Sequence, residues 1–184
     1  MAVFGVVAFF GYILLFALAQ SYIGHRVGAV NLRARESPAR LVLIVVCLLL
    51  FTLALKGMKD QRPHPALIAI GMALVAAGLV LSMWAQVALG KYWVGGVGLH
   101  KKHVLLTSGP YHYVRHPMYS GILLSTLGLG LAGWNILYLL SMLCWSGGFL
   151  FRAFGEDYTL AHRFGDSYAA YANKTGMIFP RFRK

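Results

Sequence analysis

The chain has 184 residues, of which 59% are hydrophobic and only 12% are charged, and its formal net charge is +12. Soluble domains carry about 25% charged residues, so the composition excludes an ordinary soluble domain and favours a helical membrane protein. The basic residues lie between apolar runs rather than in one patch, which argues against nucleic-acid binding. The two cysteines, Cys47 and Cys144, lie within apolar runs and lack the spacing of a metal site.

The N-terminal half contains three apolar runs. A helix needs about 20 apolar residues to cross the hydrocarbon core, and residues 3–23, 41–58 and 66–89 meet or approach that length. Pro63 and Pro65 precede the third run, where proline is tolerated because the first N–H groups of a helix have no partner. The start of the chain has neither a basic region nor a cleavage site, so we expect the first run to remain as a membrane helix.

The C-terminal half begins with a polar stretch of nearly thirty residues, 90–117, and loops of that length are usually functional. Two short adjacent apolar runs follow, 118–133 and 135–151, and they predict a helical hairpin. The polar tail contains a further helical pattern over residues 156–172, with a possible break at Gly165. The sequence therefore predicts an all-α integral membrane protein with about five transmembrane helices.

The basic residues indicate how the five predicted spans are oriented. Five spans place the loop at 24–40, the loop at 90–117 and the tail at 152–184 on one side, and all three are basic. Because positive charge is enriched in cytoplasmic loops, we expect this side to be cytoplasmic and the N-terminus to lie outside. The segment at 56–65 is also basic and runs against this assignment.

The stretch from His103 to Gly121 carries most of the chemical information. Arg115 and His116 stand just before Pro117, which can begin the fourth apolar helix. Backbone N–H groups and the positive dipole end at a helix start favour anions, so we expect an anion site here for a carboxylate or phosphate. Three tyrosines could offer aromatic faces to a sulfonium or ammonium cation, Tyr111, Tyr113 and Tyr119. Each tyrosine alone could equally be an interfacial anchor.

A second group of polar residues follows the last apolar run. Glu156 and Asp157 are two of only five acidic residues in the chain, and Arg152 lies four residues earlier. Arg152 and Glu156 would share a helix face, where a local ion pair is worth about 0.3 kcal/mol. Acidic residues at the edge of a membrane are also candidates for function.

The C-terminal half resembles the isoprenylcysteine carboxyl methyltransferase family, to which membrane methyltransferases of phospholipid amines are related. The resemblance covers residues 84–184 and is carried by four motifs: His103–Gly121, Arg152-x-x-x-Glu156-Asp157, Phe164-Gly165-x-x-Tyr168-x-x-Tyr171 and Phe179-Pro180. It implies a membrane methyltransferase that uses S-adenosylmethionine. The chain would be a single membrane domain over 1–184, with three spans in 1–89 and a cofactor-binding catalytic half in 90–184.

The resemblance also implies site residues. Together with the anion-site argument, it predicts a cofactor pocket lined by eleven residues, namely His103, Val104, Leu105, Leu106, Tyr111, Arg115, His116, Pro117, Met118, Tyr119 and Glu156. Arg152 would face the acceptor, and Arg152 and Glu156 would be the catalytic pair. Two departures stand out: the family often has Glu-Glu where this chain has Glu156-Asp157, and the family's cofactor-contacting glutamine falls near Gly96.

The acceptor is open at this level. A carboxylate such as that of an isoprenylcysteine is ionised at neutral pH and would need only a cation, whereas an ammonium acceptor would need a base. Phospholipid amines and small thiols are the alternatives. Two further alternatives remain. A protein that binds anionic lipid without catalysis would account for the basic loops, and a relative of membrane sterol reductases would account for the C-terminal architecture.

Overall fold

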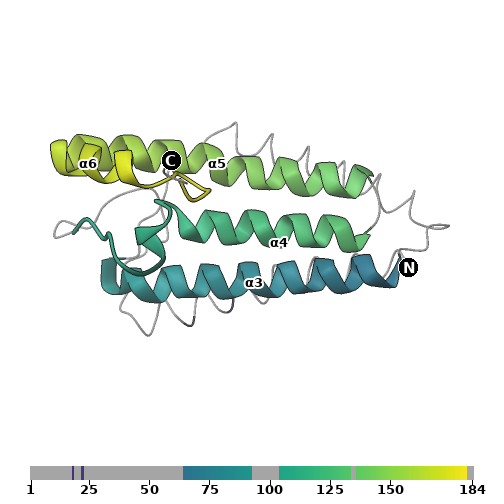
Figure 1. Cartoon of the computed structure of the whole chain (residues 1–184). Coiled ribbons are helices and arrows are strands. Elements are labelled where there is room, and N and C mark those ends of the chain that lie inside the picture. The colour runs from purple at the N-terminus through teal and green to yellow at the C-terminus, as the bar shows by residue number, and fades with distance from the viewer. Residues whose placement is uncertain (1–17, 19–21, 23–63, 93–103, 134–135, 182–184) are drawn as a thin grey trace.

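The computed structural model describes residues 64–92, 104–133 and 136–181, together with Leu18 and Tyr22. Within these ranges the chain is helical, and its order is α3 (Pro65–Leu89), η1 (Gly90–Tyr92), η2 (Gly109–His112), α4 (Pro117–Gly133), α5 (Ile136–Phe164) and α6 (Asp166–Lys174). Figure 1 shows α3, α4 and α5 side by side, with α4 in the middle and α6 against the end of α5. The all-helical prediction is confirmed for the described part of the chain.

The third predicted span, residues 66–89, is confirmed as helix α3. His64 caps its N-terminus by accepting the N–H of Ala66 at 3.3 Å, and Pro65 occupies the first turn. The helix ends at Gly90, whose φ of 54° suits glycine. Over Pro65–Tyr92 this segment is long and apolar enough to cross a membrane, whereas the apolar part of α4 is shorter. The predicted spans at 3–23 and 41–58 lie outside the described residues, apart from Leu18 and Tyr22, so the count of five remains a prediction.

The predicted hairpin corresponds to α4 and α5, but its second helix is longer than the apolar run at 135–151. Helix α5 continues unbroken to Phe164 and has 29 residues, which corresponds to a length of about 44 Å. The hydrocarbon core is only about 30 Å thick. The charged residues after 151 lower the hydropathy without interrupting the helix. The predicted break at Gly165 is confirmed, because Gly165 has a φ of 52° and separates α5 from α6.

Glycines bring α3 and α4 into close contact. A Cβ atom added to Gly121 would collide with Ser82 and with the carbonyl of Gly78, and one added to Gly128 would collide with the carbonyl of Gly71. Membrane helices lacking a hydrophobic driving force associate through such small residues. The hydroxyl of Ser82 also donates to the carbonyl of Met118 at 3.1 Å. This contact fixes the beginning of α4 against α3. The polar site starts at this end of α4.

Candidate functional site

The C-terminal tail returns to the start of α4 and pairs with it. We call residues 175–178 the C-terminal strap. The N–H of Arg115 donates to the carbonyl of Gly176 at 2.8 Å, and the N–H of His116 donates to that of Met177 at 3.0 Å. Ser120, one turn into α4, donates its hydroxyl to the carbonyl of Ile178 at 2.6 Å. The backbone N–H groups of Arg115 and His116 and the hydroxyl of Ser120 therefore hold the strap in place.

A small apolar core lies beneath this junction. It is formed by Tyr119, Ile122, Ala153 and Ile178, which come from α4, α5 and the strap. Met118 and Phe149 pack against it. Since removing apolar surface from water stabilises the fold, this core supports the polar groups that lie next to it.

Asp157 is the centre of the polar network. Its Oδ1 lies 2.7 Å from Nε2 of His116 and also accepts the hydroxyl of Tyr168, while its Oδ2 accepts Nε and Nη2 of Arg115 at 3.2 and 2.9 Å. Burial alone would raise the pKa of the Asp157 carboxyl, but the hydrogen bonds from these three partners outweigh burial and hold that pKa at about 2. Burial and the adjacent carboxylate raise the pKa of Tyr168 above its usual value. Asp157 is therefore ionised and fully engaged at neutral pH.

Glu156 forms a neighbouring group on the same helix. Its Oε1 accepts the hydroxyl of Tyr119 at 2.7 Å and Nε of Arg152 at 3.0 Å. Its Oε2 lies 3.7 Å from Nδ1 of His116, which is too long for a hydrogen bond. The His116 ring thus lies between the two carboxylates and stacks on the ring of Tyr119 at 5.7 Å between centroids. The predicted pair Arg152–Glu156 is present, and it is joined to the Arg-His-Pro motif.

Arg115, which the sequence predicts to bind an anion, donates instead to groups of the chain itself. Its Nη1 donates to the carbonyls of Ala172 and Thr175 at 3.1 and 2.8 Å, in addition to the two bonds to Asp157. At least four of its five N–H groups are used in this way. The backbone N–H groups of Arg115 and His116 are also taken by strap carbonyls. The tail therefore folds back onto the start of α4 and takes these donors, and binding of an anion there remains a prediction.

The other predicted pocket residues differ in how deeply they are buried. Tyr111 is tied to α6 because the hydroxyl of Tyr171 donates to its carbonyl at 2.7 Å. Burial raises the pKa of Tyr111 above its usual value, and the charges of Glu156 and Tyr171 add to the effect. Pro117 and Tyr119 are buried, Leu105, Leu106 and Met118 are half-buried, and Val104 is exposed. His103 lies outside the described residues, and contact of any of these residues with a cofactor remains a prediction.

The structure adds tail residues that reasoning from single motifs did not select. Tyr168 and Tyr171 entered only through the Phe-Gly-x-x-Tyr-x-x-Tyr motif, and each makes a hydrogen bond to the site. Gly176 was not selected at all. A Cβ atom at Gly176 would collide with the carbonyl of Phe179, so glycine allows the strap to turn. Lone glycines give little signal in a sequence that contains 21 of them.

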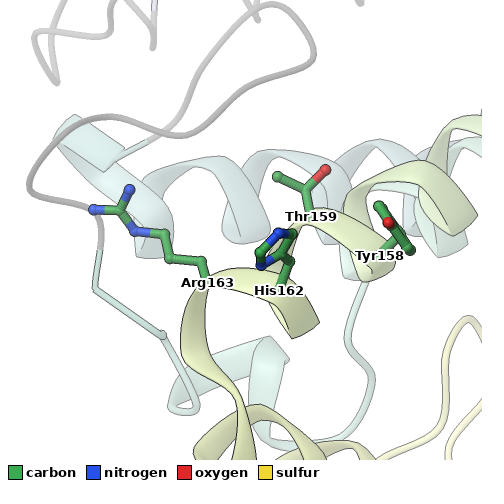
Figure 2. Close-up of a pocket in the computed structure, with 4 residues that line it drawn as sticks. All are labelled: Tyr158, Thr159, His162 and Arg163. Carbon is green, nitrogen blue, oxygen red and sulfur yellow. The ribbon is translucent and has the colours of Figure 1, made fainter.

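A shallow depression of about 400 Å³ lies elsewhere on α5, lined by Tyr158, Thr159, His162 and Arg163. Figure 2 shows that all four side chains come from the C-terminal part of that helix. It is open to solvent and does not include Glu156, Asp157 or His116, so we place the candidate site at the carboxylates rather than here. Within the described ranges, no group of three His, Cys, Asp or Glu side chains is arranged to hold a metal ion.

Comparisons with known proteins identify relatives of the chain. The chain is 34% identical to the cobalt-zinc-cadmium resistance protein CzcN of Cupriavidus metallidurans over 119 residues. This alignment covers 64% of this chain and 50% of the relative. It is 32% identical over 134 residues to the protein-S-isoprenylcysteine O-methyltransferase of Xenopus laevis, which covers 70% of this chain and 46% of the relative. The chain thus spans about half the length of these relatives.

A solved structure supports the same fold. The eukaryotic intramembrane Ras methyltransferase ICMT superimposes with a TM-score of 0.68 at 23% identity, over 96% of this chain and 67% of that chain. Together with the sequence similarity to the Xenopus laevis enzyme, this shared fold confirms the resemblance to isoprenylcysteine carboxyl methyltransferases. The phospholipid methyltransferase family model matches residues 66–167, which include α3, α4, the Arg-His-Pro motif and both carboxylates. The chain belongs to the phospholipid methyltransferase family.

Proposed function

We propose that the chain is an integral-membrane S-adenosylmethionine-dependent methyltransferase whose acceptor is a lipophilic carboxylate of the isoprenylcysteine type. The observation that carries the proposal is the meeting of Glu156, Arg152 and His116 at the end of two apolar helices. A carboxylate, a guanidinium and an imidazole at that position can hold both a charged cofactor and a charged acceptor beside the bilayer. Membership of a methyltransferase family and the similarity to isoprenylcysteine O-methyltransferases support it.

The residues at the junction fit the chemical groups of S-adenosylmethionine. Its ribose hydroxyls and amino group are donors, and Oε2 of Glu156 has room for another donor because its contact with His116 is 3.7 Å long. Tyr111, which is half-buried, can present an aromatic face to the sulfonium or the adenine. When bound, the cofactor supplies an electrophilic methyl group. The predicted pocket residues 104–106 and 116–119 would complete the enclosure.

Arg152 would orient the acceptor. It is half-buried on α5, one turn before Glu156. A guanidinium suits an acceptor that has a carboxylate, because the two can form charge-assisted hydrogen bonds. Because a carboxylate is already ionised at neutral pH, the protein has only to position it and exclude water, and positioning supplies most of the rate.

The main alternative acceptor is a phospholipid amine, which the description of the family model favours. An ammonium group must first lose a proton to a base. Both oxygens of Asp157 are bound by His116, Tyr168 and Arg115, so Glu156 would have to be that base. We prefer the carboxylate acceptor because of the similarity to isoprenylcysteine O-methyltransferases. A small thiol acceptor, or binding of anionic lipid without catalysis, would not need Arg152 to orient a carboxylate.

We further propose the orientation predicted from the loops. The N-terminus would lie outside, and the 90–117 loop and the tail would be cytoplasmic. The site would then lie at the cytoplasmic surface of the bilayer, where a lipophilic acceptor can enter from the membrane. The whole of 1–184 would act as one membrane domain, with 90–184 as its catalytic half.

Two measurements test the proposal on the full chain in lipid nanodiscs. Calorimetry should show S-adenosylmethionine binding to the purified protein, and a well-folded protein that binds none would contradict the proposal. Labelled methyl donor should then be supplied with a farnesylcysteine analogue or with phosphatidylethanolamine, in separate reactions. We expect label in the farnesylcysteine analogue. Label in the phospholipid instead would keep the enzyme class and replace the acceptor.

A further inference from the structure

The two oxygens of Asp157 bind different parts of the chain. Oδ1 binds the His116 ring and the Tyr168 hydroxyl, whereas Oδ2 binds the Arg115 guanidinium. Asp157 lies on α5, Arg115 and His116 precede α4, and Tyr168 lies on α6. One carboxylate therefore connects three segments, and Arg115 lies 42 residues before Asp157 in the chain.

Arg115 extends this connection to the C-terminal strap. Its Nη1 donates to the carbonyls of Ala172 and Thr175, and its backbone N–H donates to that of Gly176. Without Asp157, the guanidinium would keep only its carbonyl partners and would be a half-buried charge lacking a counter-ion. Breaking a buried pair by removing one partner costs more than removing both.

Asp157 also determines how the His116 ring faces Glu156. The side chain of His116 is only 5% exposed. Nε2 lies 2.7 Å from Asp157, so Nδ1 is the nitrogen that faces Oε2 of Glu156. The hydrogen bond that one imidazole nitrogen makes determines which of the two ring nitrogens carries the proton. The ring is thereby held in one orientation, with the Tyr119 ring stacked against it.

We propose that Asp157 is a positioning residue that holds the His116 ring and the C-terminal strap in place for the reaction without itself touching cofactor or acceptor. The kinetic part of this proposal rests on the proposed methyltransferase function. The structural part, which concerns the strap and the ring, does not. Glu156 and Asp157 are then adjacent carboxylates with different tasks: Glu156 faces the ligands and Asp157 faces the protein.

The test compares the full-length Asp157→Asn variant with Asp166→Asn as the matched control. Asp166 is an exposed acidic residue in the first turn of α6. Trypsin cleavage after Lys174 reports release of the strap, because Lys174 is exposed and Thr175 is buried. Ring ¹⁵N chemical shifts of His116, assigned with a His116→Gln variant, report the proton position. The KM for S-adenosylmethionine and the kcat with a farnesylcysteine analogue report the reaction.

We expect Asp157→Asn to accelerate cleavage after Lys174 and to raise the cofactor KM, each on the order of tenfold because a charge-assisted hydrogen bond is lost. It should also change the His116 ring shifts while leaving kcat within about threefold of the wild-type value. The Arg115→Gln/Asp157→Asn double variant should be cleaved at least as fast as Asp157→Asn alone, since it also lacks the bonds from Arg115 to the carbonyls of Ala172 and Thr175. Asp166→Asn should match wild type in all three measurements.

Three results would overturn the proposal. Unchanged strap cleavage and ring shifts would show that Asp157 holds neither element. A released strap with unchanged KM would show a structural role only, and a large loss of kcat with unchanged KM would place Asp157 in the chemistry. If wild type transfers no methyl group, the proposed function fails and the cleavage and ring shifts alone decide. Should Asp157→Asn not fold, Tyr168→Phe, which removes one bond to Oδ1, should give the same changes at about threefold.

Discussion

The α3–α4 interface and the junction of α4 with the tail are held together by opposite means. The first is a close contact of glycines with few polar bonds, in which Gly78 lies against Gly121 and Gly71 against Gly128. The second is a network of charges and backbone carbonyls around Asp157 and Arg115. The α3–α4 contact therefore depends on glycines, which have no side chain. The junction depends instead on the pairing of its charged groups.

The largest expected effect concerns the glycine interface. Gly121→Val would place a branched side chain against Ser82 and the Gly78 carbonyl, so we expect a loss of more than about 3 kcal/mol because the backbones cannot separate without losing their contact. Gly147→Val is the matched control, since no described atom lies within 4 Å of an added Cβ there. Thermal unfolding in nanodiscs measures both. Equal melting temperatures would show that the close approach of α3 and α4 does not support the fold.

The polar junction can be broken at its proposed ligand-facing residue. Glu156→Ala should weaken S-adenosylmethionine binding by about a hundredfold, because charged hydrogen-bond partners are lost, and His116→Ala should act in the same direction. Asp166→Ala changes another acidic residue of the same region and should leave the affinity unchanged. Calorimetry measures the three affinities. Wild-type affinity in both site variants would remove the site from this junction.

Acid should weaken the junction and spare the glycine interface. The pKa of the Asp157 carboxyl is about 2 in the folded protein and about 3.9 in an unfolded chain. Its ionised form therefore stabilises the fold above about pH 4, and this contribution, on the order of 2 kcal/mol, is lost as the pH falls from about 4 to about 2. Asp157→Asn should lack this part of the acid dependence. Thermal unfolding against pH compares the two proteins, and parallel curves would refute the assignment.

A smaller effect separates the acceptor from the cofactor. Arg152→Ala should raise the KM for a farnesylcysteine analogue by about tenfold, since a charged contact to the carboxylate is lost, and should change cofactor affinity little. Arg163→Ala removes an exposed base further along the same helix and serves as the control. Steady-state kinetics gives both KM values. An unchanged acceptor KM would leave Arg152 as the local ion-pair partner of Glu156.

Sequence predicted the two regions unequally. Apolar runs were sufficient to locate α3 and α4, and the turn preference of Gly165 was sufficient to locate the end of α5. The pairing of the strap with Arg115 and His116 was not predictable, since it joins backbone groups some sixty residues apart and leaves no pattern in either segment. For the same reason, the sequence did not reveal that Arg115 donates to the carbonyls of Ala172 and Thr175.

The length of α5 links the bilayer to the chemistry. The helix runs without interruption from Ile136 to Phe164 and carries Arg152, Glu156 and Asp157 beyond its apolar part. A rigid rod cannot change its depth at one end alone. Under the proposed function, the thickness of the surrounding membrane and the tilt of α5 would set the height of these three residues above the lipid headgroups.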